Sequence, residues 1–137
     1  PFGKANLVKP GSSLTVITYG ALVQRTLQAV SNIEQRRQDV SIEVLDLRSL
    51  APYDWEAIAE SVRKTGKVLI AHEDTLSWGY GSEIAARIAS DLFWDLDAPV
   101  ARVAAQDTWV AYHPQLEAEI LPQTEDLIRE AERLLAV

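Results

Sequence analysis

The sequence predicts an α/β domain in which helices cover both faces of a mostly parallel β-sheet. Four short segments rich in Val, Ile, Leu and Thr alternate with segments whose apolar residues recur three and four positions apart. Such alternation is typical of parallel sheets, because each parallel strand needs a crossover, usually a helix, to bring the chain back to the same edge. The length of 137 residues and the apolar fraction of 47% suit one compact domain with its own core.

The strands are predicted from runs of β-branched and aliphatic residues that end at a glycine or a polar residue. They cover residues 14–19, 41–47, 67–71 and 99–104. The tripeptide LVK around Val8 is a candidate for a short additional strand at the edge. The predicted sheet therefore has four strands and one candidate edge strand.

The helices are predicted from apolar stripes and from the residues that flank them. The first covers residues 21–36, and the second follows Asp54, a plausible N-cap, and ends near Gly66. Ser82 is predicted to cap the third helix, and the last helix begins near Thr124. The stretch between the fourth strand and the last helix is marked by prolines, and we predict it to be irregular.

Composition excludes several classes of partner and site. The net charge of −7, with no run of Lys or Arg, argues against nucleic acid and against an anionic membrane surface. With no cysteine there is no disulfide and no thiolate zinc site. The N-terminal residues PFGKANLVKPGSS lack a signal-peptide pattern, so we expect an intracellular protein. The chain begins with Pro, and we interpret it as one domain, residues 1–137, of a longer polypeptide.

Functional residues are expected at the carboxyl ends of the strands, where ligands and partners of open α/β sheets meet the protein. Adjacent residues on a strand point to opposite faces, so His72 and Glu73 do not readily act as an acid/base pair. We therefore expect one of them to be packed inside and the other to form a hydrogen bond or an ion pair. The predicted strand ends are Gly20, Arg48, His72–Glu73 and Gln106–Asp107.

Large aromatic residues in predicted loops are the second group of candidates. For each residue alone, a place in a satellite core is as good an interpretation as an interface anchor. Four of them together favour an interface. They are Trp78, Tyr80, Trp109 and Tyr112.

Other kinds of site have little support in the sequence. Two histidines without a metal-ligand spacing do not favour a metal site, so we predict none. The text GYGSE places Ser82 where a helix cap is expected rather than a nucleophile. The turn Gly79–Gly81 lacks the pattern of a dinucleotide or P-loop site, so it is only a weak indication of phosphate binding. We predict no catalytic, cofactor-binding or metal-binding residue in this chain.

An ordered set of motifs resembles the transketolase C-terminal domain family. Within it, the beta subunit of the decarboxylating component of pyruvate and branched-chain 2-oxoacid dehydrogenase complexes is the nearest in pattern. The resemblance covers nearly the whole chain. Its motifs are D-L-R-x-L-x-P-x-D at 46–54, K-T-G-K-V at 64–68, the pair His72-Glu73, G-[FY]-G-x-E-I at 79–84 and A-P-V-x-R-V at 98–103.

The resemblance implies a three-layer sandwich with a five-stranded sheet and one antiparallel edge strand. It implies an enzyme that decarboxylates a 2-oxoacid and passes the acyl group to lipoyl, with thiamine diphosphate and Mg held by other domains. The C-terminal domain would build contacts with an alpha subunit and a second beta subunit. It would also lie near the docking place of the acyltransferase's peripheral subunit-binding domain. The implied location is the cytoplasm, or the mitochondrial matrix in a eukaryote.

The sequence departs from the family pattern after Asp107-Thr108, where P-x-P-[FY] is usual. Trp109 and Ala111 replace the two prolines, and the preceding turn, A-A-Q-D-T, lacks a glycine that is common there. Two alternatives to the dehydrogenase stay open: a transketolase or deoxyxylulose-phosphate synthase, or a free-standing module that binds a small anion at residues 79–82. The interface candidates are Arg48, His72, Glu73, Trp78, Tyr80, Trp109 and Tyr112.

Overall fold

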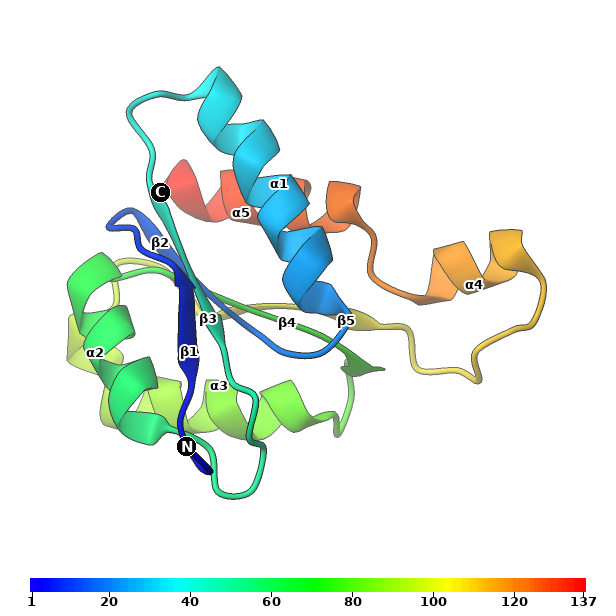
Figure 1. Ribbon diagram of the computed structural model, residues 1–137, viewed down its shortest axis with the longest axis horizontal. Helices are drawn as coiled ribbons and strands as arrows, with labels where there is room; N and C mark the ends of the chain where they lie inside the picture. The colour runs from blue at the N-terminus through cyan, green and yellow to red at the C-terminus, as the bar shows by residue number, and fades with distance from the viewer.

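The computed structural model, which describes residues 1–137, has one five-stranded sheet between two layers of helices (Figure 1). The strand order is β1-β3-β2-β4-β5. β1 runs antiparallel to β3, and all other neighbours are parallel. The predicted fold class is therefore confirmed, including the antiparallel edge strand. The strands are β1 Asn6–Lys9, β2 Leu14–Thr18, β3 Ile42–Asp46, β4 Val68–Thr75 and β5 Ala101–Ala105.

Two helices cover each face of the sheet (Figure 1). α1 and α5 pack on one face, where their apolar residues share a core cluster with β2 and β3. α2 and α3 pack on the opposite face and form a second cluster with the same sheet. None of the helices combines the length and the apolar character needed to cross a membrane. The helices are α1 Leu22–Arg36, α2 Trp55–Thr65, α3 Tyr80–Asp91, α4 Pro114–Ile120 and α5 Thr124–Leu135, with a short 3-10 helix at Phe93–Asp95.

The central strand β2 shows why these residues form a buried strand. All five of its side chains are buried, because helices lie above and below it. Val16 belongs to the core under α1 and α5, whereas Ile17 belongs to the core over α2 and α3. A continuous apolar run is the expected pattern for a parallel strand that is covered on both faces.

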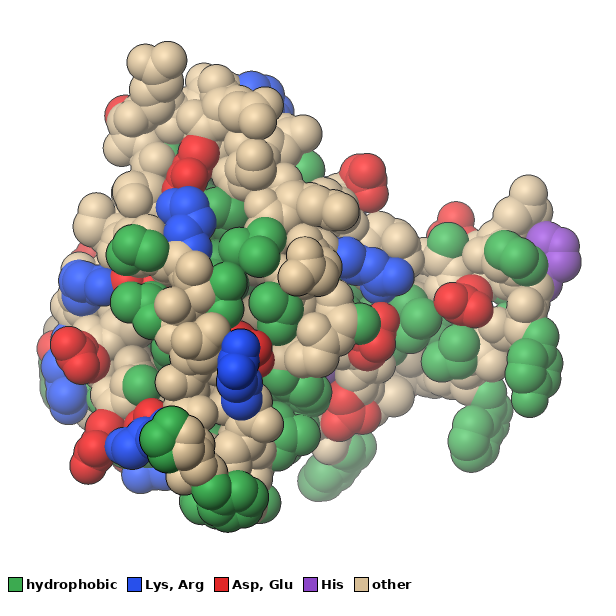
Figure 2. All heavy atoms as spheres, viewed as in Figure 1, with side chains coloured by type: hydrophobic (Ala, Val, Ile, Leu, Met, Phe, Trp, Pro, Cys, Tyr) green, Lys and Arg blue, Asp and Glu red, His purple; other side chains and the backbone are tan.

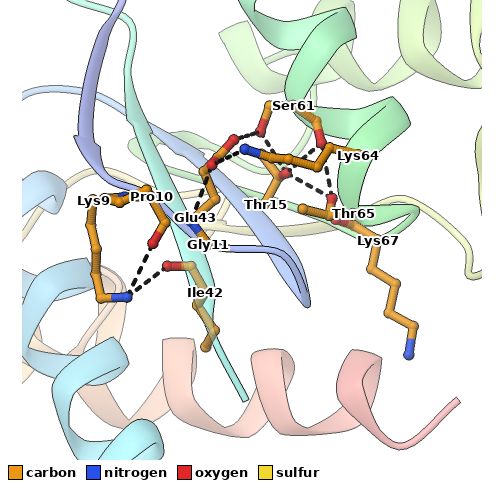
Figure 3. Close-up of polar contacts among 10 residues, drawn as sticks. All are labelled: Lys9, Pro10, Gly11, Thr15, Ile42, Glu43, Ser61, Lys64, Thr65 and Lys67. Atoms are coloured by element: carbon orange, nitrogen blue, oxygen red, sulfur yellow. Dashed lines mark hydrogen bonds and ion pairs between the residues drawn. The ribbon is translucent and has the colours of Figure 1, made fainter. Parts of the chain in front are cut away.

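A buried polar network fastens α2 to the sheet (Figure 3). The Glu43 carboxylate, on β3, accepts hydrogen bonds from the Ser61 hydroxyl at 2.6 Å, the Gly11 amide at 3.1 Å and the Lys64 ammonium. The Thr15 hydroxyl, on β2, lies 2.7 Å from that of Ser61. Each polar atom has a partner, so the network adds orientation without leaving an uncompensated charge.

The helix boundaries confirm some sequence predictions and correct others. Asp54 caps α2 by accepting a hydrogen bond from the Ala57 amide, and Gly66 ends that helix with φ of 68°. The prediction that Ser82 caps the third helix is wrong. α3 begins at Tyr80, and its N-cap is Gly79, which has no side chain to accept a capping hydrogen bond.

The segment predicted to be irregular contains the short helix α4. Pro114 occupies the first turn, where its missing amide hydrogen costs nothing, and the His113 ring accepts a hydrogen bond from the Gln115 amide. Pro114, which suggested a loop, therefore marks a helix start. α4 extends away from the sheet and the other helices (Figure 1).

Candidate functional site

Three aromatic side chains stand almost fully in solvent on the loops that follow β4 and β5. The exposed fractions are 99% for Trp78, 93% for Trp109 and 102% for Tyr112. Figure 2 shows large hydrophobic side chains projecting from the segment that carries α4. Several exposed aromatics close together in a polar surface are typical of a protein contact. We call the loop segments 76–79 and 106–113 the aromatic rim.

Hydrogen bonds join the two loops of the aromatic rim. The Asp107 carboxylate accepts the Ser77 amide at 2.9 Å and the Ser77 hydroxyl at 2.5 Å. The Leu76 amide donates to the carbonyl of Ala105 at 2.9 Å. The rim is therefore one connected surface built from two separate loops.

Arg102, on β5, fastens the first loop of the rim to the sheet. Its Nη1 donates to the Leu76 carbonyl at 2.6 Å and to the Ser82 hydroxyl at 2.7 Å. The Ser82 hydroxyl, predicted to cap the helix, thus helps to hold Arg102. A charged donor shared between a carbonyl and a hydroxyl is stronger than a neutral hydrogen bond.

Trp78 has an unfavourable backbone conformation for its residue type. Its φ is 62°, in the left-handed region that glycine adopts freely and a bulky side chain rarely does. Its ring makes no compensating core contact, because the side chain is exposed. The strain at Trp78 is therefore not offset by packing within this chain, and uncompensated backbone strain is found mainly at functional sites.

His72 is packed inside the domain. Its ring is fully buried, and its Nε2 accepts the Gly81 amide at 2.9 Å while Nδ1 lies 3.2 Å from the Asp74 carbonyl. This arrangement satisfies the neutral ring with its hydrogen on Nδ1. Burial lowers the pKa of His72, which keeps the ring neutral at pH 7. His72 therefore fixes the start of α3 and does not reach the surface itself.

Glu73 points to the other face of the sheet and forms an ion pair. Its carboxylate lies 3.2 Å from Nη1 of Arg25 on α1. The same Arg25 nitrogen donates to the Pro122 carbonyl at 2.8 Å, between α4 and α5. The expectation that one residue of the His72–Glu73 pair is packed and the other paired is confirmed.

Tyr80 contacts the rest of the domain rather than standing free. Its hydroxyl donates to the Leu50 carbonyl at 2.5 Å. Its ring packs edge-on against Tyr19 and Tyr53, at centroid distances of 5.7 Å and 6.3 Å. Burial raises the pKa of Tyr80, so the hydroxyl stays a donor at neutral pH. Its place is a small aromatic core beside the rim.

Arg48 lies apart from the other candidates. It follows β3, which is separated from β4 by β2. Its φ is 55°, and the Asp46 carboxylate holds it by accepting both its amide and its Nε, each at 3.2 Å. The structure thus brings the loops of Trp78, Trp109 and Tyr112 together. Arg48 also lies at the carboxyl ends of the strands, but apart from these loops.

Sequence reasoning did not identify Ser77, Arg102 and the role of Asp107. Arg102 is the arginine of the A-P-V-x-R-V motif and Asp107 stands at a predicted strand end, but neither pattern gave them a role, because their contacts join positions far apart in the chain. It also did not single out Phe93 and Trp94, which are exposed beside an apolar hollow of about 660 Å³. Two adjacent aromatics just after a helix end were the only signal for that second surface.

The glycine turn before α3 does not fit the diphosphate of thiamine diphosphate, and the His, Asp and Glu side chains do not fit its magnesium ion. The amide hydrogens at the start of α3 are already bonded: Tyr80 donates to the Asp74 carboxylate, Gly81 to the His72 ring and Ser82 to a backbone carbonyl. Space is also lacking, because a Cβ on Gly79 would lie 1.9 Å from a carbonyl oxygen. No group of three or more His, Asp or Glu side chains converges as a metal site.

Comparison with known proteins places this geometry in a family. The sequence matches the model described as transketolase, C-terminal domain, over residues 3–127. It is 43% identical over 136 residues to the 3-methyl-2-oxobutanoate dehydrogenase subunit beta of Mycobacterium tuberculosis, covering 98% of this chain and 38% of that protein. It is 40% identical over 133 residues to the pyruvate dehydrogenase E1 component subunit beta of Staphylococcus epidermidis, covering 97% and 40%.

A solved structure described as a split gene transketolase, inactive beta4 tetramer, is similar with a TM-score of 0.83 and 27% identity, covering 98% of this chain and 43% of that one. The chain spans about two fifths of the length of the curated relatives named above. From the match over residues 3–127 and the relatives aligned over nearly its full length, the chain belongs to the transketolase C-terminal domain family.

Proposed function

We propose that this chain is the C-terminal assembly domain of a thiamine-diphosphate-dependent 2-oxoacid dehydrogenase beta subunit, and that residues 1–137 are one domain of that longer subunit. The observation that carries the proposal is the aromatic rim, which presents Trp78, Trp109 and Tyr112 to solvent from two joined loops. The curated relatives of the chain named above, at about 40% identity, are beta subunits of dehydrogenases that act on pyruvate and 3-methyl-2-oxobutanoate.

In the proposed enzyme, the chain contributes contacts rather than chemistry. The complete enzyme would oxidatively decarboxylate a 2-oxoacid and transfer the acyl group to lipoyl, with the cofactor serving as the electron sink. The glycine turn before α3 is filled by the domain's own atoms, so the cofactor would be held by other domains. The aromatic rim would then pack against the alpha subunit or a second beta subunit.

A further partner is the peripheral subunit-binding domain of the lipoyl acyltransferase. This binding domain would dock near the C-terminal domain. The rim itself is assigned to the partners within the dehydrogenase component, because clustered tryptophans are typical anchors of stable interfaces.

The test is assembly of the complete beta subunit with its alpha subunit. Replacing Trp78 or Trp109 by Ala should weaken assembly about tenfold or more, because buried tryptophans are the commonest energetic hot spots of interfaces. Analytical ultracentrifugation of purified subunits measures the dissociation constant. Glu73→Ala should act in the same direction, through the loss of the Arg25 ion pair that holds the neighbouring elements.

Trp94→Ala is the matched control, because Trp94 is equally exposed but lies beyond the other end of α3. Its subunits should assemble as the unmodified ones do. A rim variant that assembles fully yet loses turnover would contradict the proposal, because the residue would then act in the chemical step.

A transketolase-type enzyme is the second candidate, favoured by the TM-score of 0.83 to the split gene transketolase. The complete polypeptide with its partner would then transfer a ketol group between sugar phosphates instead of oxidising a 2-oxoacid. Assays with both substrate classes separate the candidates. A free-standing anion-binding module has less support, because the amide hydrogens at the start of α3 are already bonded.

A further inference from the structure

A bidentate contact joins the two loops of the aromatic rim. Both hydrogen bonds run from Ser77 to the Asp107 carboxylate, one from the amide and one from the hydroxyl, and the residues are 30 positions apart in sequence. Two bonds to one carboxylate fix both distance and orientation. We call this contact the Ser77–Asp107 clasp.

The clasp sits directly beside the two exposed tryptophans. Trp78 follows Ser77, and Trp109 lies two residues after Asp107. Without the clasp, the Leu76–Ala105 backbone hydrogen bond and Arg102 would still hold the first loop at Leu76, but no other hydrogen bond joins Ser77 or Trp78 to residues 107–109. The relative position of the two backbone segments that carry the indole rings therefore depends on this contact.

The surroundings of the clasp argue against a main role in folding stability. Both residues are exposed, and hydrogen bonds in contact with water contribute little to the free energy of unfolding. The clasp also ties down a loop in which Trp78 has an unfavourable φ of 62°. A contact that adds little stability but fixes the position of a strained loop is useful when a partner recognises the loop in that position.

We infer that Asp107 is a positioning residue for subunit assembly. Through Ser77 it holds Trp78 and Trp109 as one preformed recognition unit. A partner then binds both rings without first ordering two independent loops, which is the advantage of preorganisation. This inference rests on the proposed function, since it needs the partner subunit that the rim would contact.

The charge of Asp107 supports this role at neutral pH. The hydrogen bonds from the Ser77 hydroxyl and amide lower the pKa of the Asp107 carboxyl. Asp107 is therefore an ionised acceptor for both donors, with the positive Arg102 nearby.

The experiment uses the complete beta subunit with its alpha subunit. Asp107→Ala removes both acceptor oxygens and should weaken assembly about fivefold or more, while the thermal midpoint of the beta subunit changes little. Asp107→Asn keeps an acceptor for the Ser77 amide and can donate to the hydroxyl, so it should recover much of the affinity. Asp39→Ala is the matched control, because Asp39 is an exposed carboxylate bonded two residues away to Arg37.

A double-mutant cycle separates positioning from a direct contact. If the clasp acts through Trp109, Asp107→Ala should cost much less affinity in a Trp109→Ala background than in the unmodified protein. Equal losses in both backgrounds would overturn the inference, since Asp107 would then act independently of the ring. The inference would also be overturned if Asp107→Ala lowered the affinity only because it lowered the thermal midpoint of the beta subunit.

The two hypotheses fail in different ways. If Trp78→Ala and Trp109→Ala weaken assembly but Asp107→Ala behaves like Asp39→Ala, the clasp inference is wrong and the proposed function stands. If neither tryptophan affects assembly, the proposed function itself is wrong.

Discussion

At the scale of single residues, Trp78 shows a conflict between fold and surface. A left-handed backbone costs a residue with a Cβ roughly 1–2 kcal/mol of conformational free energy. The exposed ring of Trp78 makes no packing contact within this chain that would offset this cost. Such conflicts between local preference and observed structure concentrate at functional sites. Trp78 is therefore the residue at which stability and assembly should respond in opposite directions.

Trp78→Gly should raise the stability of the chain by about 1 kcal/mol, because glycine adopts this φ without strain. The same change should weaken assembly, because the anchor is gone. Urea unfolding measures the first effect and ultracentrifugation of the subunits the second. Trp109→Gly is the control: Trp109 has no positive φ, so its replacement should give no gain in stability.

Gly81→Ala should destabilise the chain by about 1–3 kcal/mol, the usual cost of overpacking a buried site. A Cβ at Gly81 would lie 2.2 Å from Nε2 of His72, and that ring is buried and has little room to move. Urea unfolding again provides the measurement. Adding His72→Ala should make the alanine at position 81 much less costly, and an unchanged cost would show that the ring is not the obstacle.

At the scale of elements, the attachment of α2 to the sheet depends on a charge that sequence patterns do not reveal. Ser61 and Lys64, one turn apart on α2, both donate to the Glu43 carboxylate of β3. Burial by itself raises the pKa of Glu43, but the hydrogen bonds from Lys64, Ser61 and Gly11 outweigh it and lower the pKa below its ordinary value. The α2–sheet contact should therefore weaken in acid.

The sign follows from the two states of the chain. In the unfolded chain Glu43 takes up a proton near pH 4.5, and in the folded chain it does so only at lower pH. Its contribution to stability is thus present above pH 4.5 and is lost as the pH falls through the folded pKa. Glu43→Gln should lower stability at pH 7 by about 1–3 kcal/mol and flatten the acid loss.

Urea unfolding between pH 7 and pH 3 measures this dependence. Glu60→Gln is the control on the same helix, because Glu60 is exposed and has no ion pair. An equally steep acid loss in the Glu43→Gln chain would show that other groups cause it.

At the scale of the whole molecule, one sheet with covered faces leaves its carboxyl edge free for contacts. The helices occupy the faces, so the loops after β4 and β5 are where side chains can stand in solvent (Figure 1). The Phe93–Trp94 surface lies beyond the C-terminal end of α3, away from the rim at its N-terminal end. Replacing Trp78 or Trp109 should therefore weaken subunit assembly, whereas Trp94→Ala should leave it unchanged.

The sequence by itself determined the fold class, the five strands, four of the helices and the candidate aromatics. Periodic apolar residues and local capping signals act within a few positions of each other, so strands such as β2 and the Asp54 cap follow from nearby residues. Local signals were less reliable where several fit one stretch: Ser82 suited a cap but holds Arg102 instead, and Pro114 suited a loop but begins α4.

Only the tertiary structure decided which of the aromatics face solvent and what holds them. Tyr80 and Trp78 are two residues apart and look alike in the sequence, yet Tyr80 packs against Tyr19 and Tyr53 while Trp78 is exposed. The partner of Ser77 is 30 residues away. Such contacts depend on how β4 and β5 align in the sheet, and a linear pattern carries no information about distances between loops that are remote in the chain.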